Sequence, residues 1–264
     1  KRPFLFYDSL RQGLWVGANG PLLDFYQGPN HSHIDIDPTV DNSNYPYIDA
    51  ITLDQKGNLW IKTPKALSRL DLSGNWYSFN CGDEFSTYFI IGGIYPKGDF
   101  MYVTVGGSYP WLPNEPHKNL YKIDGDMVIN VDIPEALLLE VNNFALVSEQ
   151  DIWFTASGSS QIIHYMNGQT QAYTDTDLGG TLGSSSIVLY NDSTLLVCSN
   201  NQGLDVFKQG QWYHPTIPSN RIANSHVSCW HVSDDHKLYM GQSALLVLED
   251  INALLDQLGQ PISV

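Results

Sequence analysis

The stretch that decides the fold is Asp54-Gln55-Lys56-Gly57-Asn58-Leu59-Trp60-Ile61-Lys62-Thr63, because its pattern returns along the whole chain. It contains a tight turn at Gly57 and then an apolar strand centred on Trp60. A second apolar strand, Ala66–Leu70, follows a short polar loop. Flanking runs at Ala50–Asp54 and Asn75–Phe79 complete a predicted meander of four antiparallel strands. One such sheet cannot bury both faces alone, so it needs neighbours of its own kind.

Six copies of this unit are visible, aligned on the central residue of the first apolar strand: Trp15, Trp60, Tyr102, Trp153, Leu196 and Tyr239. Their spacings are 45, 42, 51, 43 and 43 residues, within the range of about 40–50 residues typical of propeller blades. We therefore predict an all-β fold, a β-propeller of four-stranded antiparallel blades. Six blades are expected, with seven as the alternative if one blade is degenerate. The four aromatic rings from Trp15 to Trp153 are expected to occupy equivalent buried positions.

A ring of repeats forms one body, so we predict a single domain over residues 1–264, with blades at about 1–37, 47–80, 89–133, 143–174, 185–216 and 226–264. After the sixth repeat the strand pattern breaks. Asp250 is predicted to cap a short helix that ends at Gly259 and presents one apolar face: Ile251, Leu254, Leu255 and Leu258. The outer strand of the last blade is then expected from Pro261–Val264 or from Lys1–Tyr7.

The charge balance of the 264-residue chain is 13 Lys and Arg against 28 Asp and Glu, a formal net charge of −15. A polyanion is repelled by such a surface, so no nucleic-acid partner is expected. No apolar run approaches the ~20 residues that span a bilayer, so no membrane insertion is expected. Three cysteines are too few to hold the fold together. We expect buried thiols, with a Cys198–Cys229 disulfide as the alternative.

Residues Asp54–Thr63 followed by Ala66–Leu70 resemble the two-component regulator propeller repeat. The hallmark of that family is an aspartate, a glycine turn, Asn-Leu-Trp-Ile, a small residue, Thr, and then Gly-Leu. Gly13–Ala18 and Asp151–Thr155 are similar but looser copies, and the Gly before the second apolar strand is kept at Gly203. The resemblance implies a propeller related to periplasmic sensor ectodomains and to streptogramin-lyase-like proteins.

In a meandering blade, the loops between the second and third strands and the connections between blades lie on one face, around the channel mouth. The longest such loop, Gly106–Asn119, carries Tyr109 and Trp111 among three prolines, which restrict its backbone. The predicted ligand-binding set on this face is Tyr109, Trp111, Tyr47, Tyr88, Asn44, Asn142, Arg221 and His226. Aromatic rings mixed with amides suit a neutral polar ligand such as a sugar or peptide. The alternatives are a Trp111 that folds back to plug the channel, and ordinary loop composition.

Four residues alternate along one face of a probable outer strand: His31, His33, Asp35 and Asp37. They are an alternative transition-metal site, although an exposed strand shows such polar alternation anyway. Streptogramin-lyase-like propellers depend on histidines and a glutamate with magnesium at the channel mouth, and His226, Glu84 and His117 are expected on that face. No repeat carries the local pattern of those enzymes. We therefore predict no catalytic residue, no cofactor, no resident metal and no need of metal for folding.

The sequence thus favours a non-enzymatic, sensor-like recognition propeller, periplasmic or secreted in a bacterium. Its partner is predicted to be a small polar ligand or a protein, bound at the channel-mouth face. Two alternatives stay open. One is a lyase or hydrolase with His226, Glu84 or His117 as acid or base, and the other is a structural assembly platform with an exposed apolar patch.

Overall fold

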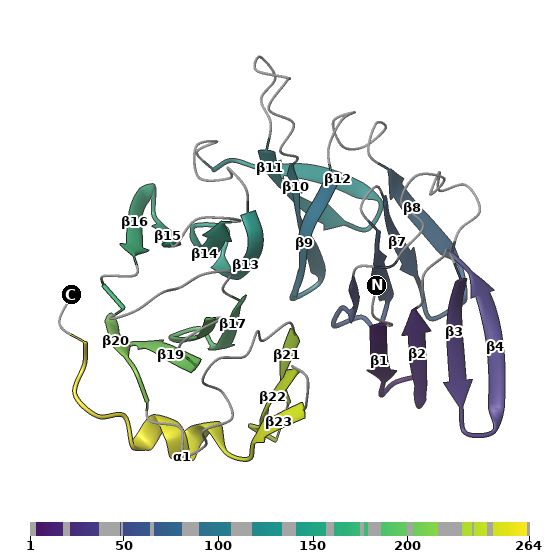
Figure 1. Cartoon of the computed structure of the whole chain (residues 1–264). Helices are drawn as coiled ribbons and strands as arrows, with labels where there is room; N and C mark the ends of the chain where they lie inside the picture. Colours follow the sequence, from purple (N-terminus) through teal and green to yellow (C-terminus); the bar gives the residue numbers. More distant parts are fainter. Residues whose placement is uncertain are drawn as a thin grey trace. The chain divides into compact units, whose positions relative to one another are not determined.

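The computed structural model describes residues 4–17, 22–36, 48, 50–63, 66–80, 90–106, 118–133, 141–156, 161–174, 177–178, 186–199, 203–215, 229–233, 235–241 and 245–262. The chain divides into two compact units, Lys1–Leu139 and Glu140–Val264 (Figure 1). No helix in these ranges has both the length and the apolar character needed to cross a membrane.

Three four-stranded antiparallel sheets make up the first unit, and within each the strands pair in chain order. Sheet one contains β1 (Phe4–Asp8), β2 (Gly13–Gly17), β3 (Leu22–Gln27) and β4 (Asn30–Asp35). Sheet two contains β5 (Ala50–Leu53), β6 (Leu59–Lys62), β7 (Ala66–Leu70) and β8 (Trp76–Asn80). Sheet three contains β9 (Ile90–Lys97), β10 (Phe100–Gly106), β11 (Lys118–Asp124) and β12 (Met127–Val131).

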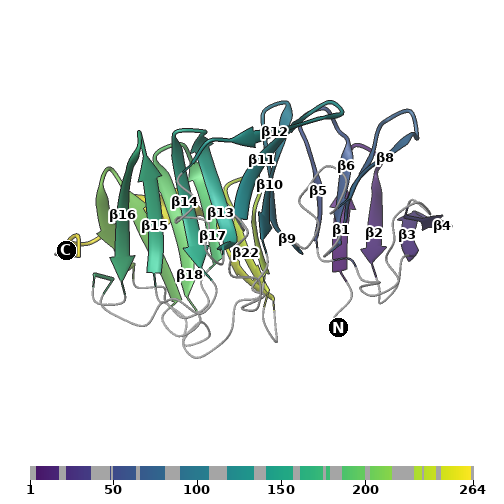
Figure 2. The same cartoon turned by 90° about the horizontal axis from the view of Figure 1, so that it is seen from above.

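The second unit repeats this plan, and Figure 2 shows neighbouring strands of the unit side by side. Sheet four contains β13 (Val141–Ser148), β14 (Asp151–Ala156), β15 (Gln161–Met166) and β16 (Gln169–Thr174). Sheet five contains β17 (Ser186–Asn191), β18 (Thr194–Ser199), β19 (Gly203–Lys208) and β20 (Gln211–Tyr213). Sheet six has three strands among the described residues, β21 (Cys229–Val232), β22 (Leu238–Gly241) and β23 (Leu245–Leu248), followed by helix α1 (Ile251–Asp256).

Short turns set the register of these meanders. Between β15 and β16 the chain turns through Asn167 and Gly168, both with positive φ (51° and 81°), and Met166 pairs directly with Gln169. Two residues of positive φ define the tight hairpin turn whose twist matches that of the strands, and Asn-Gly is its preferred sequence. Local sequence therefore fixes which side chains of the two strands face each other.

The aromatic residue at the centre of the second strand is buried, as predicted: Trp15, Trp60, Tyr102 and Trp153 are 1–4% exposed. For Trp15, Trp60 and Trp153, the residue that pairs with it on the third strand packs against its ring. Trp153 lies opposite His164, with the rings stacked 3.7 Å apart, and Trp15 lies opposite Phe25 at 4.3 Å. These aromatic pairs anchor the middle of their sheets.

Neighbouring sheets within a unit pack through shared apolar clusters. In the first unit, Trp60 and Leu67 of sheet two meet Met101 and Val103 of sheet three. In the second unit, one cluster joins sheets five and six to α1. The predicted requirement for neighbouring sheets is met in this way inside each unit.

Helix α1 begins as predicted, because the Asp250 carboxylate accepts a hydrogen bond from the Ala253 N–H at 3.1 Å. Ile251 and Leu255 are buried in the cluster with sheets five and six, and Leu254 and Leu258 are partly buried there. The helix ends at Asp256, before the predicted stop at Gly259. The Gln257 N–H bonds to the Leu254 carbonyl at 3.1 Å, a tightened last turn that closes the helix early.

Both expected sources of an outer strand for sheet six have other partners. Residues Phe4–Asp8 form β1, which pairs with β2 in sheet one. The Ile262 N–H donates to the Trp212 carbonyl of β20 at 2.8 Å, so the chain at Ile262 lies against the edge of sheet five. The reason is the path of α1, which packs across sheets five and six before the chain reaches Ile262.

Candidate functional site

Most of the predicted ligand-binding residues lie outside the described part of the chain: Asn44, Tyr47, Tyr88, Tyr109, Trp111, Arg221 and His226. Glu84 and His117 also lie outside it. The backbone of Asn142 is described and belongs to β13. Asn142 stands where the register of β13 shifts, since Val141 pairs with Ala156 and Asn143 with Thr155. A bulge of this kind often redirects a side chain beside a functional site.

The base of the predicted binding loop is well defined. Strands β10 and β11 pair without interruption from Met101 opposite Ile123 to Gly106 opposite Lys118. The last residue before the loop, Gly106, therefore faces the first residue after it, Lys118. Strand β9 carries a bulge near this end, where the Thr104 hydroxyl accepts a hydrogen bond from the Gly93 N–H at 2.7 Å. The two ends of the loop are thus held by a hairpin that is paired up to Gly106 and Lys118.

A small cavity of about 230 Å³ lies in the first unit and is lined by Asp54, Lys56, Asn58, Trp60, Arg69, Asp71, Asp99, Ile123 and Gly125. The Asp54 carboxylate accepts hydrogen bonds from the backbone and side-chain N–H groups of Asn58 (2.9 and 2.8 Å) and from the Trp60 indole (2.8 Å). In the cavity wall, the polar groups of Asp54, Asn58 and Trp60 are thus hydrogen-bonded to one another at the turn before β6. Pockets for small molecules usually enclose about 300–1,000 Å³, so this cavity is better explained as a space left where sheets two and three pack against each other.

Arg69 of sheet two links these two sheets. Its guanidinium lies 4.1 Å from the centre of the Tyr77 ring and 5.6 Å from that of Trp60. It donates to the Gly125 carbonyl and to the Asp126 carboxylate (2.7 Å), both in the turn between β11 and β12. Arginine suits this position because its planar group stacks on rings and donates several hydrogen bonds at once.

Sheet one has the corresponding arrangement. The Asp8 carboxylate accepts hydrogen bonds from the Trp15 indole (3.1 Å) and the Arg11 guanidinium (2.8 Å). Arg11 also donates to the Gly57 carbonyl (3.1 Å) and the Asp71 carbonyl (3.4 Å) of sheet two. Burial raises the pKa of Asp8, but its hydrogen bonds and the Arg11 charge outweigh burial, so the pKa is lowered overall. These charged groups have structural roles.

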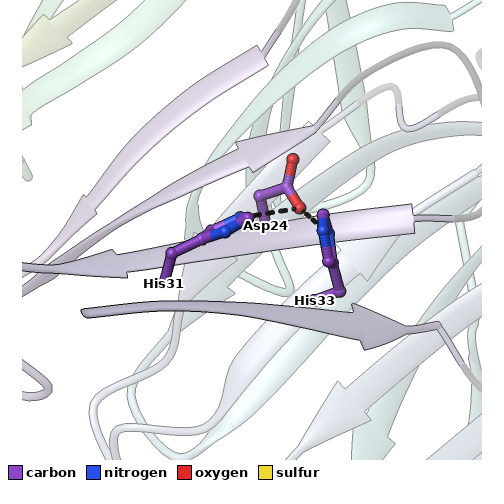
Figure 3. A group of neighbouring side chains, drawn as sticks. All are labelled: Asp24, His31 and His33. Atoms are coloured by element: carbon purple, nitrogen blue, oxygen red, sulfur yellow. Dashed lines mark hydrogen bonds and ion pairs between the residues drawn. The ribbon is translucent and has the colours of Figure 1, made fainter.

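A different cluster faces solvent on the outer hairpin of sheet one. Asp24 of β3 lies directly opposite His33 of β4, and His31 lies diagonally from Asp24 on the same face (Figure 3). One Asp24 carboxylate oxygen contacts both His33 Nδ1 and His31 Nε2, the latter at 3.3 Å. One ligand atom from each residue lies within 4.8 Å of the others. This arrangement can bind a metal ion.

The sequence interpretation placed His31 and His33 together on one face of the strand, as the structure does, but it did not include Asp24. Asp35 belongs to β4, with its side chain outside the described atoms, and Asp37 lies outside the described residues. The missed residue is Asp24. A two-residue turn at Gly28 and Pro29 pairs Gln27 with Asn30, and counting back along this register places Asp24 opposite His33.

Two further histidines each pair with a single carboxylate. His164 Nε2 lies 2.7 Å from Asp151, and His214 Nδ1 lies 2.8 Å from the buried Asp205. The hydrogen bond to Asp205 raises the pKa of His214, against the opposing effect of burial. Burial also raises the pKa of the Cys198 thiol, so this side chain is an inert core group.

Solved structures resemble this chain, whereas no protein-family model and no curated protein sequence matches it. A catalytically inactive virginiamycin B lyase from Staphylococcus aureus with quinupristin has a TM-score of 0.63 at 13% identity, covering 91% of this chain and 77% of that one. PorZ, a surface component of the type-IX secretion system of Porphyromonas gingivalis, has a TM-score of 0.61 at 16% identity, covering 90% and 37%. The extracellular domain of a one-component system from B. thetaiotaomicron has a TM-score of 0.53 at 16% identity, covering 93% and 38%.

These similarities define the class. The chain is an all-β protein with the β-propeller fold, built from four-stranded antiparallel blades, and its structural neighbours include both streptogramin-lyase propellers and sensor ectodomains. Identities of 13–16% establish the fold alone. The same propeller carries enzymes and recognition modules, so function must be argued from the residues of the site.

Proposed function

We propose that this protein is a non-enzymatic recognition propeller, sensor-like, that binds a small polar ligand such as a sugar or peptide, or a protein. The proposed binding face is the channel mouth, where Tyr109 and Trp111 stand on the loop between β10 and β11. The observation that carries the proposal is the closed base of that loop, where Gly106 pairs with Lys118. A long loop on a rigid hairpin is a common location for binding residues.

The described polar groups support this proposal because they have structural roles and are not arranged as a binding site of their own. Asp8, Asp54, Arg11 and Arg69 hold turns and neighbouring sheets together. The cavity beside them is small and includes the turns at Asp99 and Gly125, at the end of sheet three opposite to the Gly106–Lys118 pair. Recognition is therefore better placed on the loops, which carry aromatic side chains able to bind at low entropic cost.

A periplasmic or secreted location fits this role. Two structural neighbours are an extracellular domain and a bacterial surface component. We infer the same side of the membrane for this chain, and an acidic surface with a charge of −15 is compatible with a soluble recognition module there.

The test is a calorimetric screen of the protein against neutral oligosaccharides and uncharged short peptides, followed by Trp111→Ala titrated with any compound that binds. Aromatic anchors dominate recognition energies, so this change should weaken binding by ~2 kcal/mol or more and leave the circular dichroism spectrum intact. Leu72→Ala is the matched control, because Leu72 is an exposed apolar residue in the turn between β7 and β8. Unchanged affinity of Trp111→Ala for a bound compound would exclude this loop as the binding site.

The likeness to virginiamycin B lyase favours one second candidate, a lyase acting at the channel mouth. Incubation of this protein with quinupristin, followed by liquid chromatography and tandem mass spectrometry, tests it directly, because ring opening by elimination gives an isomer of equal mass with a different retention time and fragmentation. Conversion of quinupristin that His226→Ala abolishes would support the enzyme and refute the non-enzymatic proposal. An unchanged retention time and fragment pattern at high protein concentration would remove quinupristin from consideration as a substrate.

A further inference from the structure

We propose that Asp24, His31 and His33 form a binding site for a divalent transition-metal ion, with Zn²⁺ or Cu²⁺ as the ion of choice. The site lies on the outer hairpin of sheet one, among residues that the proposed recognition function does not use (Figure 3). It differs from the expectation from sequence, which assigned no resident metal and considered Asp35 and Asp37 as the carboxylates.

One pair of ligand atoms already has the spacing that a metal requires. In a tetrahedral zinc site with bonds of ~2.0–2.2 Å, neighbouring ligand atoms are about 3.3–3.6 Å apart. His31 Nε2 and the Asp24 carboxylate oxygen are 3.3 Å apart. His33 Nδ1 is closer to the same oxygen, so its ring must move outward by a small rotation to admit the ion. That movement is unhindered, because the His33 side chain is 64% exposed.

The hairpin holds these groups in place before any metal arrives. Strands β3 and β4 pair at every position from Leu22 opposite Asp35 to Gln27 opposite Asn30. The His31 ring stacks on Tyr26, with ring centres 4.4 Å apart and planes 17° apart. The His31 and His33 rings meet edge to face at 4.5 Å. Two imidazoles on adjacent same-face positions of one strand and a carboxylate on the next strand therefore converge without a change of backbone.

The chemistry of the donors selects the metal. Imidazole nitrogen suits zinc, copper and nickel, whereas magnesium and calcium prefer oxygen ligands alone. Three protein ligands leave at least one coordination position for water or another donor, as in open zinc sites. Because the cluster is exposed and lies on a hairpin that is already paired, metal binding is not required for folding. The sequence expectation that the chain folds without metal is therefore compatible with this site.

The experiment is isothermal titration of the full chain with ZnCl₂ and CuCl₂, in a non-chelating buffer after treatment with EDTA. We expect one Zn²⁺ site of measurable affinity and no heat from MgCl₂ at the same concentration. His31→Ala, His33→Ala and Asp24→Asn should each weaken Zn²⁺ binding about tenfold or more, since even groups behind metal ligands contribute 10–100-fold.

His214→Ala is the matched control, because it removes an exposed histidine that also contacts an aspartate but, among the described residues, belongs to no cluster of three possible metal ligands. It should leave the Zn²⁺ titration unchanged. Absence of Zn²⁺ and Cu²⁺ binding by the unaltered chain would show that the cluster is an ion pair only and overturn the proposal. Wild-type affinity in the His31→Ala/His33→Ala double variant would also overturn it, because the metal would then bind elsewhere. Neither result bears on the channel-mouth loop.

Discussion

The hydrogen bond from the Trp60 indole to Asp54 should be one of the strongest single contacts in sheet two. The two atoms are 2.8 Å apart, Trp60 is 2% exposed and Asp54 is 7% exposed. A hydrogen bond to a charged group contributes about 1.5–3 kcal/mol. Trp60→Phe keeps most of the ring but removes the donor, so it should reduce the free energy of unfolding by about that amount. Trp60→Ala also leaves a cavity, and should cost about 3–5 kcal/mol.

Urea unfolding followed by circular dichroism measures these losses, and a second tryptophan supplies the control. Trp212 is equally buried, but its indole N–H has no hydrogen-bond partner among the described residues. Trp212→Phe should therefore cost clearly less than Trp60→Phe. A double-mutant cycle of Trp60→Phe with Asp54→Ala isolates the pair and should give a coupling of about 1.5–3 kcal/mol. A coupling below about 0.5 kcal/mol, or equal losses for the two tryptophans, would refute the assignment of stability to this contact.

Two further predictions concern charged groups. Arg69→Lys should reduce the free energy of unfolding by about 1–2 kcal/mol in urea titrations, because lysine cannot both stack on Tyr77 and donate to Gly125 and Asp126; an unchanged midpoint would contradict the role of the planar group. The raised pKa of His214 means that its contribution is fully present below about pH 6.5 and is lost as the pH rises through the pKa of the folded state. The stability gap between wild type and His214→Gln should therefore shrink between pH 5.5 and pH 9 in thermal melts, and a gap that grew with pH would show that the sign is wrong.

The strands could be predicted from sequence because their signals are local. Alternating apolar residues, an aromatic or leucine centre and glycine turns placed all six central strands, and Asp250 identified the start of α1. Contacts that depend on pairing could not be read so directly. Asp24 lies beside the two histidines because the turn at Gly28 and Pro29 sets the register of β3 against β4. No metal-binding sequence motif marks either strand of this hairpin.

Contacts between sheets were even harder to predict from sequence. Nothing near Arg69 in sequence indicates that it reaches Gly125, and nothing near Trp212 indicates that it receives the C-terminal segment. Such partners are chosen by the packing of one sheet on the next, which local patterns do not encode. The predicted channel-mouth residues stay predictions, apart from the placement of Asn142 at a bulge in β13.

The arginine contacts between sheets also have a consequence for synthesis on the ribosome. Arg11 bonds to carbonyls that lie 46 and 60 residues later in the chain, and Arg69 bonds to groups 56 and 57 residues later. At about 5–20 residues per second, the later partner of Arg11 is synthesised roughly 3–12 s after it. Each of these nascent sheets therefore emerges with its guanidinium lacking its partners on the next sheet and with one apolar face open, and is completed only when its successor has been translated. During those seconds the growing chain is most exposed to aggregation and to chaperones.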